Sequence, residues 1–286
     1  MSVTIHSKVV ELDHLIPRVV DHDREDSDVE NLIPWVFQQS DTADEGDSTF
    51  SWPDGDTNFH LFFNELSSYR AELEAYGVYH ASKRTITMPR KSWRIAGRER
   101  FRYFINSQCI LSRLLLEGIY LSLDDVQAWN LDCKVRFTTS PREVKYTIGG
   151  TRYVTRLEGA AVIGPRDQYL PIITFTGWFP GQTWEQYLIE ILSAMLGQMT
   201  QNLDILKTGF QDREVFVVGF HGPYLHIVRG FFPKDLIARV HAEGYAGNEV
   251  FHLEFTRGYY LWSKGDWLDA TRALTRLLRY LLGVQR

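Results

Sequence analysis

Cysteine is scarce in this chain of 286 residues, and long hydrophobic runs are missing. The two cysteines, Cys109 and Cys133, are too few for a disulfide framework and have no partners at the spacing of a zinc site. No stretch approaches the roughly 18 consecutive apolar residues that a membrane span needs, and the first residues do not resemble a signal peptide. These absences favour an intracellular protein, nuclear or cytoplasmic, with no membrane association.

The motifs of the common nucleotide-binding and nucleophilic enzymes are also missing. The chain has no phosphate-binding Gly-x-x-x-x-Gly-Lys-Ser/Thr, no dinucleotide fingerprint and no Gly-x-Ser-x-Gly around Ser140 or Ser193. His221 and His226 flank a predicted turn, but no third ligand stands at a fixed spacing, so we interpret both as structural. We therefore predict no cofactor.

Charge is distributed unevenly along the chain. The segment 21–56 carries twelve acids and one base, a net charge of −11 that leaves +6 on the rest of the chain. Its Ser, Thr and Gly content predicts a mobile, solvated loop, and a charge mimic that shields a basic surface is the alternative.

A basic run follows at 83–102, interrupted only by Glu99. Clustered cations of this kind bind phosphate, so the run is a candidate nucleic-acid or partner surface; its members include Lys83, Arg84, Arg90, Lys91, Arg94 and Arg98. Pairing with the acidic segment is the competing interpretation.

Hydrophobic periodicity gives the order of elements. Helical spacing occurs at 60–77, 98–121, 184–206 and 267–283, where Arg272, Arg276 and Arg279 are predicted to face outward. Strands are predicted at 133–138, 143–148, 151–157, 160–163, 171–175, 214–220 and 224–231, with 250–255 and 259–262 as a further pair. Gly149 and Gly150 predict a tight hairpin turn.

This order resembles the PD-(D/E)XK nuclease superfamily, particularly its fungal members, from about residue 98 to 286. TRYVTRLEGAAVIGP looks like the second strand with its metal-binding acid, LPIITFTGWF like the third strand, and WEQYLIEILSAMLGQM like the helix that follows it. The resemblance implies an α/β fold of the restriction-endonuclease-like type, with a mixed central sheet flanked by helices. Residues 1–97 would then form an N-terminal extension with helical and loop segments.

The resemblance also implies a site at which two acids hold a divalent metal and a lysine assists the attacking water. The second-strand acid would be Glu158, a weak candidate metal ligand, and a helix acid could be Glu117. The Glu-x-Lys of the third strand falls on Thr174, Phe175 and Thr176, and no register shift restores it, because residues 168–184 contain no Asp, Glu, Lys or Arg. Glu158 would otherwise pair with Arg156 or another base, and Glu117 would be a solvated helix acid.

Three hypotheses follow. The favoured one is a catalytically degenerate nuclease-like domain that binds a protein partner, nucleic acid or both. The second is an enzyme with altered chemistry. It could be a nuclease with a migrated Mg²⁺ site, in which Asp167 or Glu185 replaces the lost acid and Lys145 or Arg156 replaces the lysine, or a metal-free enzyme whose cleft is lined by aromatics such as Phe175, Trp178 and Tyr187. The third is a different α/β fold, in which Thr174 and Thr176 would say nothing about a lost catalytic site.

Overall fold

The computed structural model describes residues 2–38, 40–43, 52–53, 59–74, 84–89, 98–123, 135–164 and 169–284. The helices are α1 (Leu12–Leu15), α2 (His22–Glu30), α3 (His60–Glu74), α4 (Arg102–Leu121), α6 (Trp184–Leu206), α7 (Lys234–Glu243) and α8 (Lys264–Val284), with 3₁₀ turns η1 (Trp35–Phe37) and η2 (Arg98–Phe101). The strands are β1 (Ser2–Val9), β2 (Arg84–Pro89), β3 (Arg136–Thr138), β4 (Arg142–Ile148), β5 (Thr151–Leu157), β6 (Gly159–Ile163), β7 (Leu170–Gly177), β8 (Arg213–His221), β9 (Tyr224–Phe232), β10 (Asn248–Phe255) and β11 (Tyr259–Tyr260).

Nine of these strands form one mixed sheet. Their order is β2-β1-β10-β9-β8-β7-β6-β3, with β11 paired to β9. β1 is parallel to β10 and β7 is parallel to β8, whereas the remaining neighbours are antiparallel. The predicted α/β class with a mixed sheet flanked by helices is thereby confirmed.

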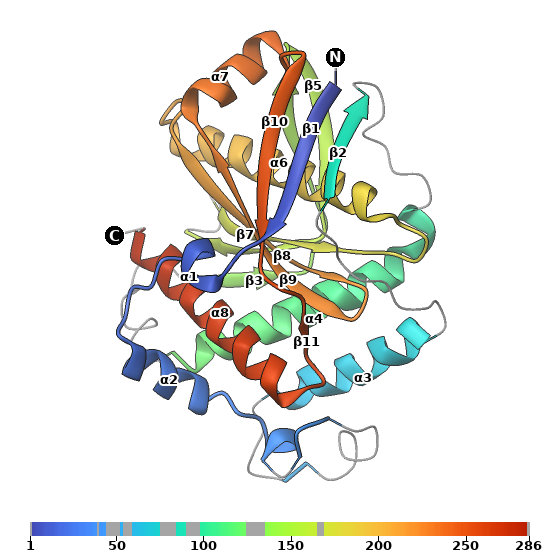
Figure 1. Cartoon of the computed structure of the whole chain (residues 1–286), viewed down its shortest axis with the longest axis vertical. Helices are drawn as coiled ribbons and strands as arrows, with labels where there is room; N and C mark the ends of the chain where they lie inside the picture. Colours follow the sequence, from blue (N-terminus) through green and yellow to red (C-terminus); the bar gives the residue numbers. More distant parts are fainter. Residues whose placement is uncertain are drawn as a thin grey trace.

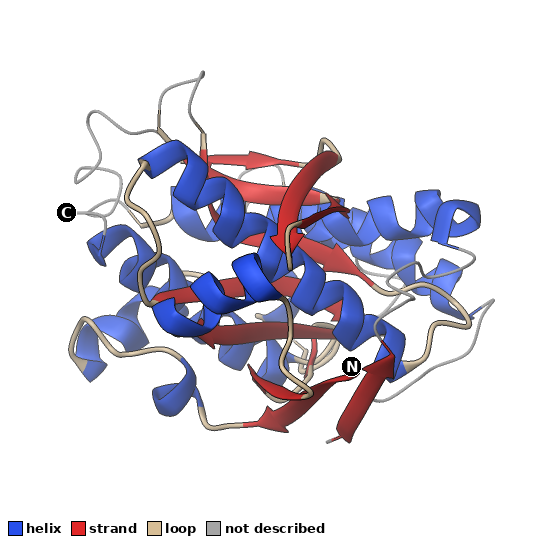
Figure 2. Cartoon of the chain, turned by 90° about the horizontal axis from the view of Figure 1, so that it is seen from above, coloured by secondary structure: helices blue, strands red, loops and turns tan. Residues whose placement is uncertain are grey.

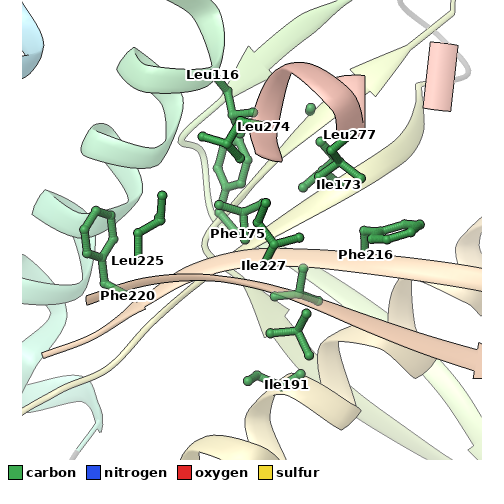
Figure 3. Close-up of a cluster of buried hydrophobic side chains, with 14 of the residues drawn as sticks. Leu116, Ile173, Phe175, Ile191, Phe216, Phe220, Leu225, Ile227, Leu274 and Leu277 are labelled. Atoms are coloured by element: carbon green, nitrogen blue, oxygen red, sulfur yellow. The ribbon is translucent and has the colours of Figure 1, made fainter. Parts of the chain in front are cut away.

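Helices cover both faces of the sheet (Figures 1 and 2). α4 and α8 lie on one face with α3 beside α4, and α6 lies on the other. In the core, Leu116 and Leu274 lie on one side of the strands and Ile191 of α6 on the opposite side (Figure 3). Every residue of β6 and β7 is buried, as expected for strands covered on both faces.

α6 connects the parallel strands β7 and β8, and its first turn is fixed by a capping box. The Thr183 hydroxyl accepts a hydrogen bond from the Gln186 amide at 3.3 Å, and the Gln186 side chain accepts one from the Thr183 amide at 3.1 Å. This reciprocal cap sets the angular position of each later side chain on α6.

The β4–β5 hairpin forms a separate two-stranded sheet that packs on α6. Gly149 and Gly150 have positive φ angles of 56° and 73°, which confirms the predicted tight turn. At Gly197 an added Cβ would lie only 2.3 Å from Val144 Cγ2, so the hairpin approaches the helix backbone directly. The turn is also tied to α7, because the amides of Gly149 and Gly150 donate to the carbonyls of Val240 and His241.

The predicted N-terminal extension contributes to the central sheet. β1 lies between β2 and β10, and its Val3 and Ile5 are buried. Helix α3, predicted as 60–77, is present as His60–Glu74, and residues 75–77 lie outside the described part of the chain.

Residues 22–30, predicted as part of a mobile acidic loop, form helix α2, whose N-cap Asp21 accepts from the Arg24 amide at 2.8 Å. Residues 39, 44–51 and 54–56 of that acidic segment lie outside the described part.

The arginines of α8 do not all face outward, so that prediction was wrong. Arg276 and Arg279 are 3% and 1% exposed, because α2 brings carboxylates to them. Arg276 donates to Glu25 at 3.0 and 2.6 Å, and Arg279 pairs with Asp28 at 2.8 Å. Helix α2 of the acidic segment thus contacts α8 through residues that are 251 positions apart in the sequence.

Strand pairing near the C-terminus also differs from the prediction. Residues 250–255 and 259–262 do not pair with each other; β10 pairs with β1 and β9, and β11 pairs with β9. Helix α7, which connects β9 to β10, was not predicted. None of the described helices is long and apolar enough to cross a membrane.

Candidate functional site

A polar cleft of about 140 Å³ lies between the start of α6, strand β5 and the end of β7. Its polar lining consists of Arg98, Thr155, Arg156, Thr176, Glu190 and Ser193. Arg98 comes from η2, just before α4, and Glu190 lies about two turns after the cap of α6. Glu158 stands between β5 and β6 and contacts the same arginines.

Arg98 bridges two carboxylates in this cleft. Its Nη2 lies 2.7 Å from Glu158 Oε1, and its Nη1 pairs with the Glu190 carboxylate. The three side chains are only 17%, 8% and 12% exposed, respectively. Such charge-assisted contacts are strong, and the planar guanidinium can serve two acids at once.

Burial and charge set the protonation of these groups. Burial acts to lower the pKa of Arg98, but Glu190 and Glu158 outweigh it, so that the pKa lies above its usual range. Burial raises the pKa of Glu190, and the attraction of Arg98 offsets only part of that rise. Glu190 is therefore easier to protonate than a solvent-exposed glutamate.

Further contacts hold Glu158 in place. Arg156 Nε lies 3.7 Å from Glu158 Oε1, and Arg156 also pairs with Glu99 at 3.4 Å. The Cys109 thiol donates to the Glu158 backbone carbonyl at 3.1 Å, and burial raises the pKa of that thiol. The ion-pair interpretation of Glu158 is thereby confirmed.

The threonines of β7 face the α6 side of this site. Thr174 and Thr176 are 0% and 5% exposed and, two residues apart, share one face of the strand. The Thr174 hydroxyl has no hydrogen-bond partner among the residues that the structure describes. Phe175, between them, points to the opposite side, toward α4 and α8 (Figure 3), although it also borders the cleft.

The other predicted site residues are placed elsewhere. Glu117 is 41% exposed on α4 and pairs with Arg113 at 3.2 Å, as expected for a helix-face acid. Trp178 and Tyr187 are fully buried and contact His221 at ring distances of 5.8 and 5.1 Å, so they belong to an aromatic cluster and do not line the polar cleft.

Most residues of the predicted basic surface lie outside the described part of the chain. Lys83, Arg90, Lys91 and Arg94 lie outside the described residues, as does Asp167; of Arg84 only the backbone, in β2, is described. Arg98 is committed to ion pairs inside the protein.

Arg156 lines the cleft, whereas two other residues considered for a migrated site lie outside it. Lys145 is exposed on β4, and Glu185 lies in the first turn of α6. Neither of them lines the cleft.

The two histidines have a structural environment. His221 and His226 are each 2% exposed, and Trp184 lies 4.8 and 6.3 Å from their rings. Burial lowers the pKa of His226 to about 4, so its ring is neutral near pH 7. A structural role was the interpretation from sequence.

Glu190 and Ser193 were not predicted as site residues. A signal was present, because Glu190 is the one charged residue between Gln186 and Gln201 in a helix that is otherwise apolar or neutral there. A lone acid on such a helix indicates a buried partner.

The donor set does not fit a divalent metal ion. Within the described ranges no group of three or more His, Cys, Asp or Glu side chains is arranged to hold one. Glu158 and Glu190 are both paired with Arg98, and the third-strand positions carry hydroxyls. Mg²⁺ prefers several oxygen ligands with carboxylates among them, so it would have to displace the guanidinium.

Comparison with known proteins adds no family assignment. No protein-family model matches this chain, and no curated protein matches it.

Proposed function

We propose that this chain is a nuclease-like domain of the restriction-endonuclease-like type that no longer cleaves nucleic acid and acts as a binding or scaffold module for a protein partner. The observation that carries the proposal is the position of Arg98, whose guanidinium lies between Glu158 and Glu190 in a cleft that the uncharged Thr176 also lines.

The physical reason lies in the charges of this site. Metal-dependent hydrolysis needs free carboxylates to hold a hard cation, which in turn generates a nucleophile from water. Arg98 already supplies the positive charge, but it has no acceptor for a water proton and does not dissociate near neutral pH. The arrangement keeps the acids buried and stable without the chemistry that a metal would provide.

A protein partner is favoured over nucleic acid, because Arg98, the member of the basic segment that enters this cleft, is paired with two internal acids and is not free to bind phosphate. Because the segment 83–97 is rich in Lys and Arg, the second experiment below also measures nucleic-acid binding.

A second candidate function rests on Glu190. A buried carboxyl group with a raised pKa in a cleft is suited to acid–base chemistry, and Ser193 and Thr176 add hydroxyls beside it. A metal-free enzyme that acts on a small polar substrate is therefore the alternative, and its activity would be lost in Glu190→Gln.

The deciding experiment combines metal titration with cleavage assays. Isothermal titration of Mg²⁺ and Mn²⁺ into wild type and Glu158→Gln is expected to show no binding in either, and labelled single-stranded DNA, duplex DNA and RNA are expected to remain intact. Micromolar binding that disappears in Glu158→Gln, together with cleavage, would establish a nuclease with migrated ligands and contradict the proposal.

Partner class is tested in parallel. Fluorescence anisotropy with the same oligonucleotides at low and high salt measures nucleic-acid binding, which loses affinity steeply with salt if phosphate contacts dominate. We expect binding to be weak. A protein that co-purifies in stoichiometric amount and rebinds after purification would support the scaffold role, whereas tight oligonucleotide binding without such a protein would replace it with a nucleic-acid-binding one.

A further inference from the structure

A second cavity, distinct from the polar cleft, lies at the other end of α6. It has a volume of about 210 Å³ and is enclosed by the C-terminal half of α6, strand β4, helix α7 and the strands β9 and β10. The contacts of the hairpin turn with α7 close one wall. Elements from four parts of the chain thus surround one space, so its shape is fixed by the fold.

The lining of this cavity is mainly apolar and rich in aromatic rings. Tyr146, Phe210, Phe232 and Phe251 contribute rings, and Met199 adds a polarisable thioether. Burial raises the pKa of Tyr146 to about 12, so its hydroxyl stays protonated and the interior carries no charge from it. An apolar cavity of about 150 Å³ holds benzene, and this one therefore has room for a ring system somewhat larger than that.

The mouth of the cavity is polar and carries a free acid. Asp204, on the last turn of α6, lines the opening and is exposed, and it takes part in no hydrogen bond or ion pair with the residues that the structure describes. His241 lies at the same opening, with its ring 5.4 Å from that of Phe210. Phe210 itself remains 39% exposed at this mouth.

We propose that this cavity binds a small arylalkyl amine, with its ring between the aromatic walls and its protonated amine at Asp204. The ring buries apolar surface, the largest favourable term available to a ligand of this size. The amine gains an opposite charge at the rim and stays in contact with water, so that its desolvation is limited. A carboxylate at the same end of the ligand would face Asp204 and be repelled.

The test uses three probes with one ring: tryptamine, the neutral 3-ethylindole and the anion indole-3-propionate. Methyl-¹³C-methionine labelling gives a direct reporter, because Met199 lines the cavity whereas Met195, also on α6, does not. Tryptamine is expected to shift the Met199 signal saturably and to bind about threefold to tenfold tighter than 3-ethylindole, whereas indole-3-propionate is expected to bind more weakly than 3-ethylindole by a similar factor.

Two variants separate the parts of the proposal. Asp204→Asn is expected to reduce tryptamine affinity to that of 3-ethylindole and to leave 3-ethylindole unchanged. Leu236→Trp, which fills the cavity from α7, is expected to abolish binding of both, while Leu206→Trp, the same change at an exposed residue outside the cavity, leaves both intact.

The proposal is overturned if no probe shifts Met199 in the wild type, a measurement that needs no variant to fold. It is equally overturned if the Leu236→Trp variant melts cooperatively and still binds tryptamine as tightly as the Leu206→Trp variant does. A third contradicting result is an Asp204→Asn variant that still binds tryptamine more tightly than 3-ethylindole.

Discussion

Removal of Arg98 takes the cation away from Glu190 and leaves Glu158 with only the longer contact to Arg156, at 3.7 Å. We expect Arg98→Met to lower the free energy of unfolding by about 3–5 kcal/mol at pH 7, because both carboxylates remain desolvated with too little compensating charge. The loss should shrink as pH falls from 7 to 5. Without the arginine the carboxyl groups bind protons more readily in the folded than in the unfolded state, so unfolding becomes less favourable at lower pH. Urea denaturation at both pH values measures the effect.

Arg113→Met is the matched control for that substitution. Arg113 also pairs with a glutamate, Glu117, but both side chains are about 40% exposed, at 39% and 41%. A loss of less than about 1 kcal/mol is expected there. Equal losses in the two variants would mean that the Arg98 cleft is solvated and that its ion pairs are ordinary surface contacts.

A buried neutral histidine gives the fold a second pH dependence. Burial lowers the pKa of His226 to about 4 from 6.5, so below about pH 6.5 the unfolded state binds a proton that the folded state does not. Its stabilising effect is present in full above pH 6.5 and is lost as pH falls toward 4, by about 3 kcal/mol in total. His226→Phe, which suits the aromatic neighbours, should reduce this slope. NMR titration of the ring protons in the folded protein gives the pKa directly, and a value near 6.5 would contradict the burial argument.

At the scale of elements, the contact of the β4–β5 hairpin with α6 depends on Gly197. Alanine normally stabilises a helix interior by about 1 kcal/mol relative to glycine. Here the new methyl group would lie 2.3 Å from Val144 Cγ2 and 3.0 Å from Thr155 Cγ2, so Gly197→Ala is expected to destabilise the protein by about 1–3 kcal/mol. Thermal and urea unfolding provide the measurement.

Two companion variants identify the cause of that loss. Gly283→Ala, in α8, meets no atom within 4 Å and should not destabilise. Val144→Ala removes the methyl groups that clash, so Gly197→Ala combined with Val144→Ala should recover part of the stability lost by Gly197→Ala. Failure of that recovery would place the strain elsewhere.

The elements that the sequence predicted are those whose signals are local. α4, α6 and α8 have long apolar stripes, and β6 and β7 are continuous apolar runs, so periodicity alone identifies them. α2 has one apolar residue, Val29, within HDREDSDVE, and its position is fixed by arginines of α8 that lie far away in the sequence. No local pattern contains that information.

The same distinction applies to the candidate site. Glu158 was predicted with a basic partner because Arg156 is adjacent in sequence. Glu190 was missed because its partner, Arg98, comes from a different helix and meets it only in the folded chain. The orientation of Arg276 was wrong for the same reason, since an arginine on a helix is normally solvated unless acids from elsewhere surround it.

For the molecule as a whole, the first and last parts of the chain are interdependent. β1 supplies the parallel partner of β10 along eight residue pairs, from Ser2 with Asn248 to Val9 with Phe255. α2 supplies the acids that neutralise the buried Arg276 and Arg279. α3 adds Tyr69, fully buried, whose hydroxyl donates to the Gly222 carbonyl at 2.8 Å. The central sheet, helix α8 and the turn between β8 and β9 therefore each contact residues before 98.

This interdependence predicts that residues 98–286 do not fold alone, although the resemblance to a nuclease core covers that range. Without residues 1–97 the fragment would expose an edge of β10, leave Arg276 and Arg279 without the acids that pair with them, and uncover the apolar surface against which α3 packs. We expect the fragment to show no cooperative thermal transition and to bind a hydrophobic dye, as collapsed but unpacked chains do. Co-expression of residues 1–97 as a separate chain should restore a cooperative transition, because the missing contacts are non-covalent. A fragment 98–286 that melts cooperatively on its own, with a dispersed amide spectrum, would instead mean that the N-terminal strands and helices are an addition to an autonomous core.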